Sequence, residues 1–150
     1  MGLHAIEKAG ELADQVSIAV KKSSGSLVPV YYKLEEILVD YRKRGMDVDL
    51  VMPALFEVDL EHNRTIPDGR SIWVAYADVL HDDLCHPSGS IHNLVKSGGS
   101  ITGTSLIQLI LEKLKLPESS ALLIAPIAAS ILGLGVNAFC MHHKEDENNS

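Results

Sequence analysis

Residues 119–141, SSALLIAPIAASILGLGVNAFCM, form a 23-residue run without a charged side chain. A helix needs about 20 apolar residues to cross the hydrocarbon core of a bilayer, and this run supplies that length. The same run suits the central helix of a bundle, where neighbouring helices cover every side. We therefore predict a hydrophobic C-terminal helix over 119–141, and the sequence leaves open whether protein or lipid covers it.

Other features of the run fit both alternatives. Small residues such as Gly133 and Gly135 allow close helix packing in protein and in lipid. Pro126 costs about 3 kcal/mol in a helix interior unless it lies near the first turn. Aromatic residues of the kind that mark membrane interfaces are absent apart from Phe139, which favours burial in protein. A third hypothesis is a segment that is covered at rest and released to self-associate or enter a membrane, although the sequence shows no trigger.

The leading functional hypothesis is a non-enzymatic helical interaction module. In it the C-terminal helix mediates self-association or membrane attachment, so we expect as partners a second copy, another protein or a membrane. No catalytic residue is predicted. The side chains expected to make the contact are the large apolar ones of the run, namely Leu123, Ile127, Ile131, Leu134 and Phe139.

Apolar residues earlier in the chain recur at helical spacing. A stripe from Leu3 to Val20 predicts an amphipathic helix, which the run SSGS at 23–26 ends. A second stripe predicts a helix that begins near Pro29 and ends near Gly45. Because the break between them is short, we expect the two helices to form an antiparallel hairpin.

Further helices are predicted in the second half of the chain. One covers about 70–84, a short one covers about 91–96, and another begins at Ser105, where Gln108 three residues later suggests a capping box. Residues 46–60 fit a short strand or part of a helix, and because of Pro53 we favour a short helix or an irregular segment, followed by a polar loop over 61–69. These patterns predict one all-α domain over 1–141, a small bundle of five or six helices with a hydrophobic C-terminal helix, followed by a disordered polar tail over 142–150.

Charge and cysteine usage bear on partners and compartment. The formal net charge of -7 argues against a nucleic-acid partner, since phosphate binding needs a basic surface. The first 25 residues lack the uninterrupted apolar stretch of a signal peptide. We therefore expect a cytoplasmic protein, with membrane association as the alternative, in which Cys85 and Cys140 are free thiols.

One stretch concentrates metal-ligating side chains, HDDLCHP at 81–87. Thiolate and imidazole suit zinc, and residues four apart share a helix face. The stretch contains no HExxH or paired CxxC motif, so zinc is the alternative to having no cofactor. The corresponding alternative function is a small metal-binding protein or metal-dependent enzyme, with the ligands His81, Cys85, His86 and His92.

Overall fold

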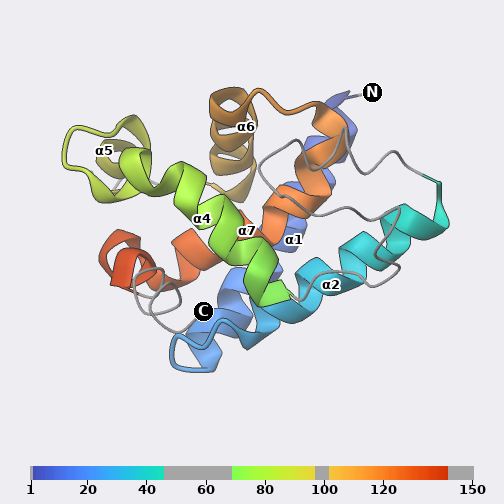
Figure 1. Cartoon of the computed structure of the whole chain (residues 1–150), viewed down its shortest axis with the longest axis horizontal. Helices are drawn as coiled ribbons and strands as arrows, with labels where there is room; N and C mark the ends of the chain where they lie inside the picture. Colours follow the sequence, from blue (N-terminus) through green and yellow to red (C-terminus); the bar gives the residue numbers. More distant parts are fainter. Residues whose placement is uncertain (1, 46–68, 97–101, 142–150) are drawn as a thin grey trace.

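The computed structural model describes residues 2–45, 69–96 and 102–141. Every regular element in these ranges is a helix (Figure 1), so the predicted all-α bundle is confirmed. The predictions for 46–68 and for the tail at 142–150 lie outside the described residues.

The helices follow the predicted order along the chain. A short helical piece over 136–141 comes after the last named helix, and we call it the terminal helix. The named elements are α1 (Gly2–Lys22), α2 (Val28–Lys43), α4 (Gly69–Cys85), α5 (Ser90–Lys96), α6 (Gly103–Leu114), the 3-10 turn η1 (Glu118–Ser120) and α7 (Ala121–Leu134).

α7 lies in the middle of the bundle (Figure 1). It packs most extensively on α1, then on α6 and α2, with a smaller contact to α4. Every residue from Leu123 to Ile131 is buried, because helices cover α7 on all sides. A helix that is apolar on every side is stable in water only when neighbouring helices surround it, as they surround α7 here.

The charge-free segment differs from the predicted continuous helix. η1 precedes α7, and Gly135 separates α7 from the terminal helix. Gly135 has φ +84°, a left-handed conformation that glycine adopts without steric cost. With 14 residues, α7 is about 21 Å long, against about 30 Å of bilayer hydrocarbon. Among the described residues, no helix has both the length and the hydropathy to span a membrane.

The amphipathic stripes of the first two helices face this centre. In α1 the buried positions run from Ile6 to Val20, and in α2 they run from Val30 to Tyr41. α1 and α7 approach closely at Gly133, where an added Cβ would lie 2.8 Å from the Cβ of Val20. α1 and α2 each pack more extensively on α7 than on one another. The two helices of the predicted hairpin are therefore positioned mainly by their contacts with α7.

Two local predictions need correction. The N-cap of α6 lies three residues earlier than expected, because Thr102 rather than Ser105 has this role and accepts a hydrogen bond from the Ser105 backbone N–H at 3.1 Å. The predicted free thiols are also wrong. Cys85, at the end of α4, forms a disulfide with Cys140 in the terminal helix. The expected cytoplasmic localisation, from which the free thiols were inferred, stays a prediction.

Candidate functional site

The outer side of α2 exposes large apolar side chains. Val28, Tyr32 and Val39 are 64%, 71% and 38% exposed, while the buried stripe of the same helix faces α7. Their spacing of four and seven residues places all three on one side of the helix. Single exposed apolar residues need no explanation, but three on one helix face beside a groove form a surface.

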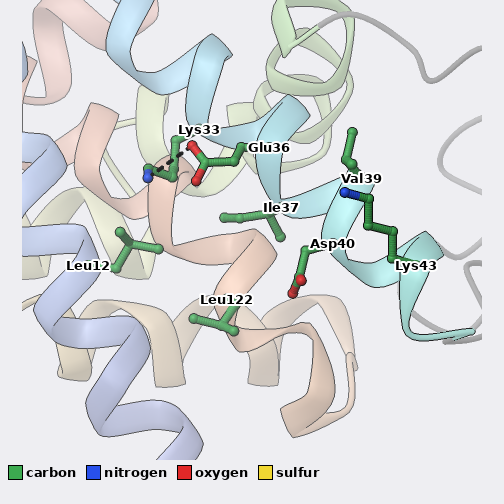
Figure 2. A pocket seen from close by; sticks show the side chains of 8 residues that line it. All are labelled: Leu12, Lys33, Glu36, Ile37, Val39, Asp40, Lys43 and Leu122. Atoms are coloured by element: carbon green, nitrogen blue, oxygen red, sulfur yellow. Dashed lines mark hydrogen bonds and ion pairs between the residues drawn. The ribbon is translucent and has the colours of Figure 1, made fainter.

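A groove between α1 and α2 adjoins these residues. It consists of two pockets of about 390 and about 370 Å³ that share Leu12 and Lys33. The first is lined by Leu12, Gln15, Val16, Ala19, Val28, Pro29, Tyr32 and Lys33. The second, shown in Figure 2, is lined by Leu12, Lys33, Glu36, Ile37, Val39, Asp40, Lys43 and Leu122. We call the groove together with the exposed side of α2 the α1–α2 face.

The groove combines apolar walls with a charged edge of mixed sign. In Figure 2, Leu12 from α1 and Leu122 from α7 lie opposite the side chains of α2. The Lys33 ammonium lies 3.2 Å from a Glu36 carboxylate oxygen, and Asp40 pairs with Arg44 at 3.1 Å. An apolar centre bordered by paired charges is typical of surfaces that bind other proteins.

The predicted contact residues of the C-terminal run lie inside the bundle. Leu123, Ile127, Ile131 and Phe139 are fully buried, and Leu134 is half-buried. For these side chains to touch a partner or lipid, α7 or the terminal helix has to leave its place. Their role in self-association or membrane attachment stays a prediction.

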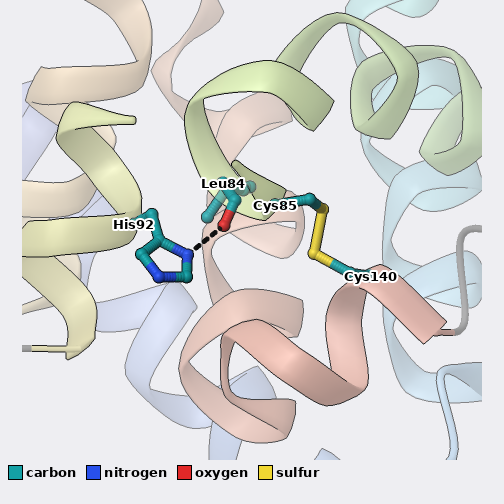
Figure 3. Close-up of a disulfide and its surroundings, with 4 residues drawn as sticks. All are labelled: Leu84, Cys85, His92 and Cys140. Atoms are coloured by element: carbon teal, nitrogen blue, oxygen red, sulfur yellow. Dashed lines mark hydrogen bonds between the residues drawn. A yellow bond between two sulfur atoms is a disulfide. The ribbon is translucent and has the colours of Figure 1, made fainter. Parts of the chain in front are cut away.

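The predicted metal ligands have different surroundings. His81 and His86 are exposed, and His86 Nδ1 lies 2.7 Å from the Ser88 hydroxyl oxygen. His92 is buried, with Nδ1 2.7 Å from the backbone oxygen of Leu84 (Figure 3). Because a carbonyl oxygen only accepts, His92 Nδ1 carries the hydrogen.

The zinc hypothesis loses its sulfur ligand in this structure. A disulfide-bonded Cys85 has no thiolate to donate. Among the described residues, no three His, Cys, Asp or Glu side chains are grouped so that they could hold a metal ion. Metal binding by His81, His86 and His92 remains an untested prediction.

The disulfide joins two parts of the fold that are held differently. On the α4 side, His92 Nδ1 donates a hydrogen bond to the Leu84 carbonyl, and the Gly89 N–H donates to His86 O at 2.9 Å. On the other side, the six-residue terminal helix buries Val136 and Phe139. Burial contributes roughly 1.5–3 kcal/mol per side chain. Two buried side chains are therefore a small apolar anchor for six residues, to which the disulfide adds a covalent link.

Trp73 connects α4, α7 and the terminal helix. Its ring makes an edge contact with Phe139, with ring centroids 5.2 Å apart. Its indole N–H donates to the Ser130 hydroxyl at 3.0 Å, and that hydroxyl donates to Ile127 O at 2.6 Å. A fully buried aromatic side chain therefore has both its ring and its polar group engaged.

Sequence reasoning missed the α1–α2 face and the disulfide. A signal for the face exists, because Val28 and Val39 lie outside the apolar stripe from which α2 was predicted. That stripe consists of Leu27, Val30, Tyr31, Leu34, Leu38 and Tyr41. The disulfide has no such signal, because its cysteines are 55 residues apart and belong to no recognisable spacing pattern. Comparisons with protein-family models, curated proteins and solved structures gave no match.

Proposed function

We propose that the chain is a non-enzymatic helical interaction module that binds a second copy of itself through the α1–α2 face. The observation that carries the proposal is the apolar side of α2, where Tyr32 is 71% exposed at the edge of an apolar groove. Tyrosine is enriched at protein interfaces, because its ring packs on apolar surface while its hydroxyl stays hydrated. In a symmetric pair, Tyr32 of each copy packs against the groove of the other.

The charges of α2 support a second copy of the chain as the partner. In a two-fold pair the same surface meets itself, so contacts between different residues occur twice. An antiparallel packing of α2 on α2 with its axis midway between residues 34 and 35 brings Lys33 opposite Glu36 of the second copy. Val28 then lies within one helical turn of Val39 of the second copy. The face is thus complementary to itself in charge and in apolar character. Its small apolar area favours a weak, concentration-dependent dimer.

The other hypothesised contacts have less support. Self-association or membrane attachment through the C-terminal run requires Ile127 and Ile131, which are buried. Zinc binding or metal-dependent catalysis lacks the Cys85 thiolate. We therefore retain the proposed interaction module and assign its contact to α1 and α2.

Sedimentation velocity over micromolar to millimolar concentrations tests the proposal on the disulfide-intact chain. We expect reversible dimerisation, which Tyr32→Glu weakens at least about tenfold because it adds a charge to the apolar centre. The matched control is Val79→Glu, which makes a similar change at a 38% exposed residue of α4, and we expect it to dimerise like the wild type. A wild type that stays monomeric at every concentration overturns the proposal, and equal dimerisation of Tyr32→Glu overturns the assigned surface.

A charge reversal tests the two-fold arrangement itself. Lys33→Glu alone and Glu36→Lys alone each place like charges opposite one another, so we expect each variant to dimerise less than the wild type. An equimolar mixture of the two variants restores opposite charges at both contacts. Recovery of dimer in the mixture supports the antiparallel α2 pair, whereas a mixture as weak as its components argues against it.

A further inference from the structure

We propose that the Cys85–Cys140 disulfide is a thiol-controlled latch for the terminal helix. In the oxidised chain the bond holds 136–141 against the end of α4 (Figure 3). Reduction by a cellular thiol or dithiol lets this helix turn outward about Gly135 while α7 stays in the core. The inference does not depend on the proposed self-association.

The α4 side of the bond is the fixed side. His92 of α5 is buried and holds the Leu84 carbonyl, one residue before Cys85. The turn after α4 is closed by the hydrogen bond from Gly89 to His86, and an added Cβ at Gly89 would overlap the backbone of Asp83. This end of α4 has no need of the disulfide to keep its position.

The Cys140 side is the movable side. The terminal helix has six residues, well below the length at which an isolated helix is stable in water. It buries Val136 and Phe139, while Asn137 and Met141 are exposed. The preceding Gly135 already has positive φ, and an added Cβ there would meet no atom within 4 Å. Space and backbone freedom are therefore present at the point where a hinge is needed.

Both cysteines are half-buried rather than enclosed, which leaves the disulfide within reach of an attacking thiolate. The thiolate of a dithiol attacks one sulfur, breaks the Cys85–Cys140 bond and forms a mixed disulfide. Its second thiol then displaces the protein sulfur. The products are two cysteine thiols, each having gained one electron and one proton, and the oxidised cyclic disulfide of the reductant.

Opening uncovers apolar surface at a defined place. Phe139 leaves the Trp73 ring, with which it makes an edge contact at 5.2 Å in the closed form. Trp73 stays attached to α7 through its hydrogen bond to Ser130. The newly exposed surface consists of the side of Trp73 that Phe139 covers in the closed form and of the apolar side of the released helix.

The single tryptophan makes this movement measurable, because all indole fluorescence of the chain comes from Trp73. We compare the oxidised protein with protein treated with dithiothreitol, and confirm reduction by titrating two thiols. We expect red-shifted Trp73 emission and stronger acrylamide quenching after reduction. By hydrogen-exchange mass spectrometry, amides of 136–141 should lose their protection, while those of α7 exchange only when the whole bundle unfolds and stay far more protected than 136–141.

The matched control is the double variant Cys85→Ser and Cys140→Ser, which should have the open fluorescence and exchange pattern and no response to dithiothreitol. Unchanged emission and unchanged exchange of 136–141 in fully reduced protein overturn the latch. Protection in 136–141 that falls only as much as protection in α1 and α7 also overturns it, because the terminal helix would then open only together with the whole bundle.

Discussion

α7 and the terminal helix come from the same charge-free run, yet different forces hold them. α7 is enclosed by α1, α2, α4 and α6, and its buried residues follow one another without interruption from Leu123 to Ile131. The terminal helix buries two apolar side chains and is attached through Cys140. Equal hydropathy therefore does not imply equal attachment, because the number of covered sides determines how much apolar surface is removed from water.

A charge introduced into α7 should destabilise the chain much more than a charge introduced into the terminal helix, and this is the largest effect that we expect. Ile127→Asp buries a carboxylate in α7 and is expected to lower the free energy of unfolding by at least about 5 kcal/mol. In the reduced chain, Phe139→Asp is expected to cost less than about 3 kcal/mol, since the short helix can then detach and hydrate the new charge. Urea denaturation measures both losses, and hydrogen exchange shows whether α7 keeps its protection in Phe139→Asp.

The matched control for these variants is Ile18→Asp, at a residue of α1 that is 52% exposed. We expect a loss within about 0.5 kcal/mol, as is usual for surface substitutions. If Phe139→Asp destabilises the chain as much as Ile127→Asp, both helices belong to one cooperative core and the comparison fails.

Removal of the disulfide is expected to have the next largest effect. A bond that closes a loop of 55 residues restricts the unfolded chain, and its loss should lower the free energy of unfolding by about 4 kcal/mol. The double variant Cys85→Ser and Cys140→Ser should therefore unfold at lower urea concentration than the oxidised wild type. Under dithiothreitol the two proteins should unfold at nearly the same concentration, and a persistent difference would contradict this account.

A smaller effect is expected where α4 is joined to α7. Ser130→Ala removes the acceptor of the buried Trp73 N–H, which should lower the free energy of unfolding by about 1–3 kcal/mol. Ser119→Ala is the matched control, since its exposed side chain lies in the same charge-free run, and its expected loss is below about 0.5 kcal/mol. Equal losses in the two variants would mean that the Trp73 hydrogen bond adds nothing to the attachment of α7.

The smallest expected effect depends on pH and concerns the start of the run. The buried Tyr41 hydroxyl donates to Ser119 O at 2.8 Å, and burial raises the pKa of Tyr41 from 10.0 to about 12. Since tyrosine in the unfolded chain loses its proton first, this contribution to stability is complete below pH 10 and is lost as the pH rises through about 12.

Tyr41→Phe should lower the free energy of unfolding by about 1 kcal/mol at neutral pH. It should also reduce the further loss of stability as the pH rises from 10.0 to about 12. Urea denaturation of the variant and the wild type at each pH measures the difference. Tyr76, whose pKa burial also raises, stays in both proteins and serves as an internal reference. Identical pH dependence of the two proteins would contradict a role for Tyr41.

Much of the fold follows from patterns within single helices. The spacing of apolar residues in 3–22 predicts both α1 and the side it buries, and the same holds for α2. A helical period is a local property, so it requires no knowledge of neighbours. Caps are less certain from sequence, as Thr102 shows, because several residues near a helix start can accept the same backbone hydrogen bond.

The candidate surfaces were harder to predict. Hydropathy identifies Ile127 and Ile131 as side chains that avoid water. It does not distinguish whether other helices, a second copy or lipid covers them. On α2, Tyr32 lies outside the predicted buried stripe, and hydropathy did not show that it is exposed beside a groove. Which side of a helix stays uncovered depends on how many neighbours pack against it.

The order of residues thus determined the helices, their apolar sides and the charge-free character of 119–141, since each depends on chain neighbours a few positions apart. Tertiary packing alone determined that α7 is central, that 119–141 divides at Gly135 and that Cys85 meets Cys140. These outcomes depend on residues far apart in the chain, whose contacts form when several helices bury their apolar sides at once.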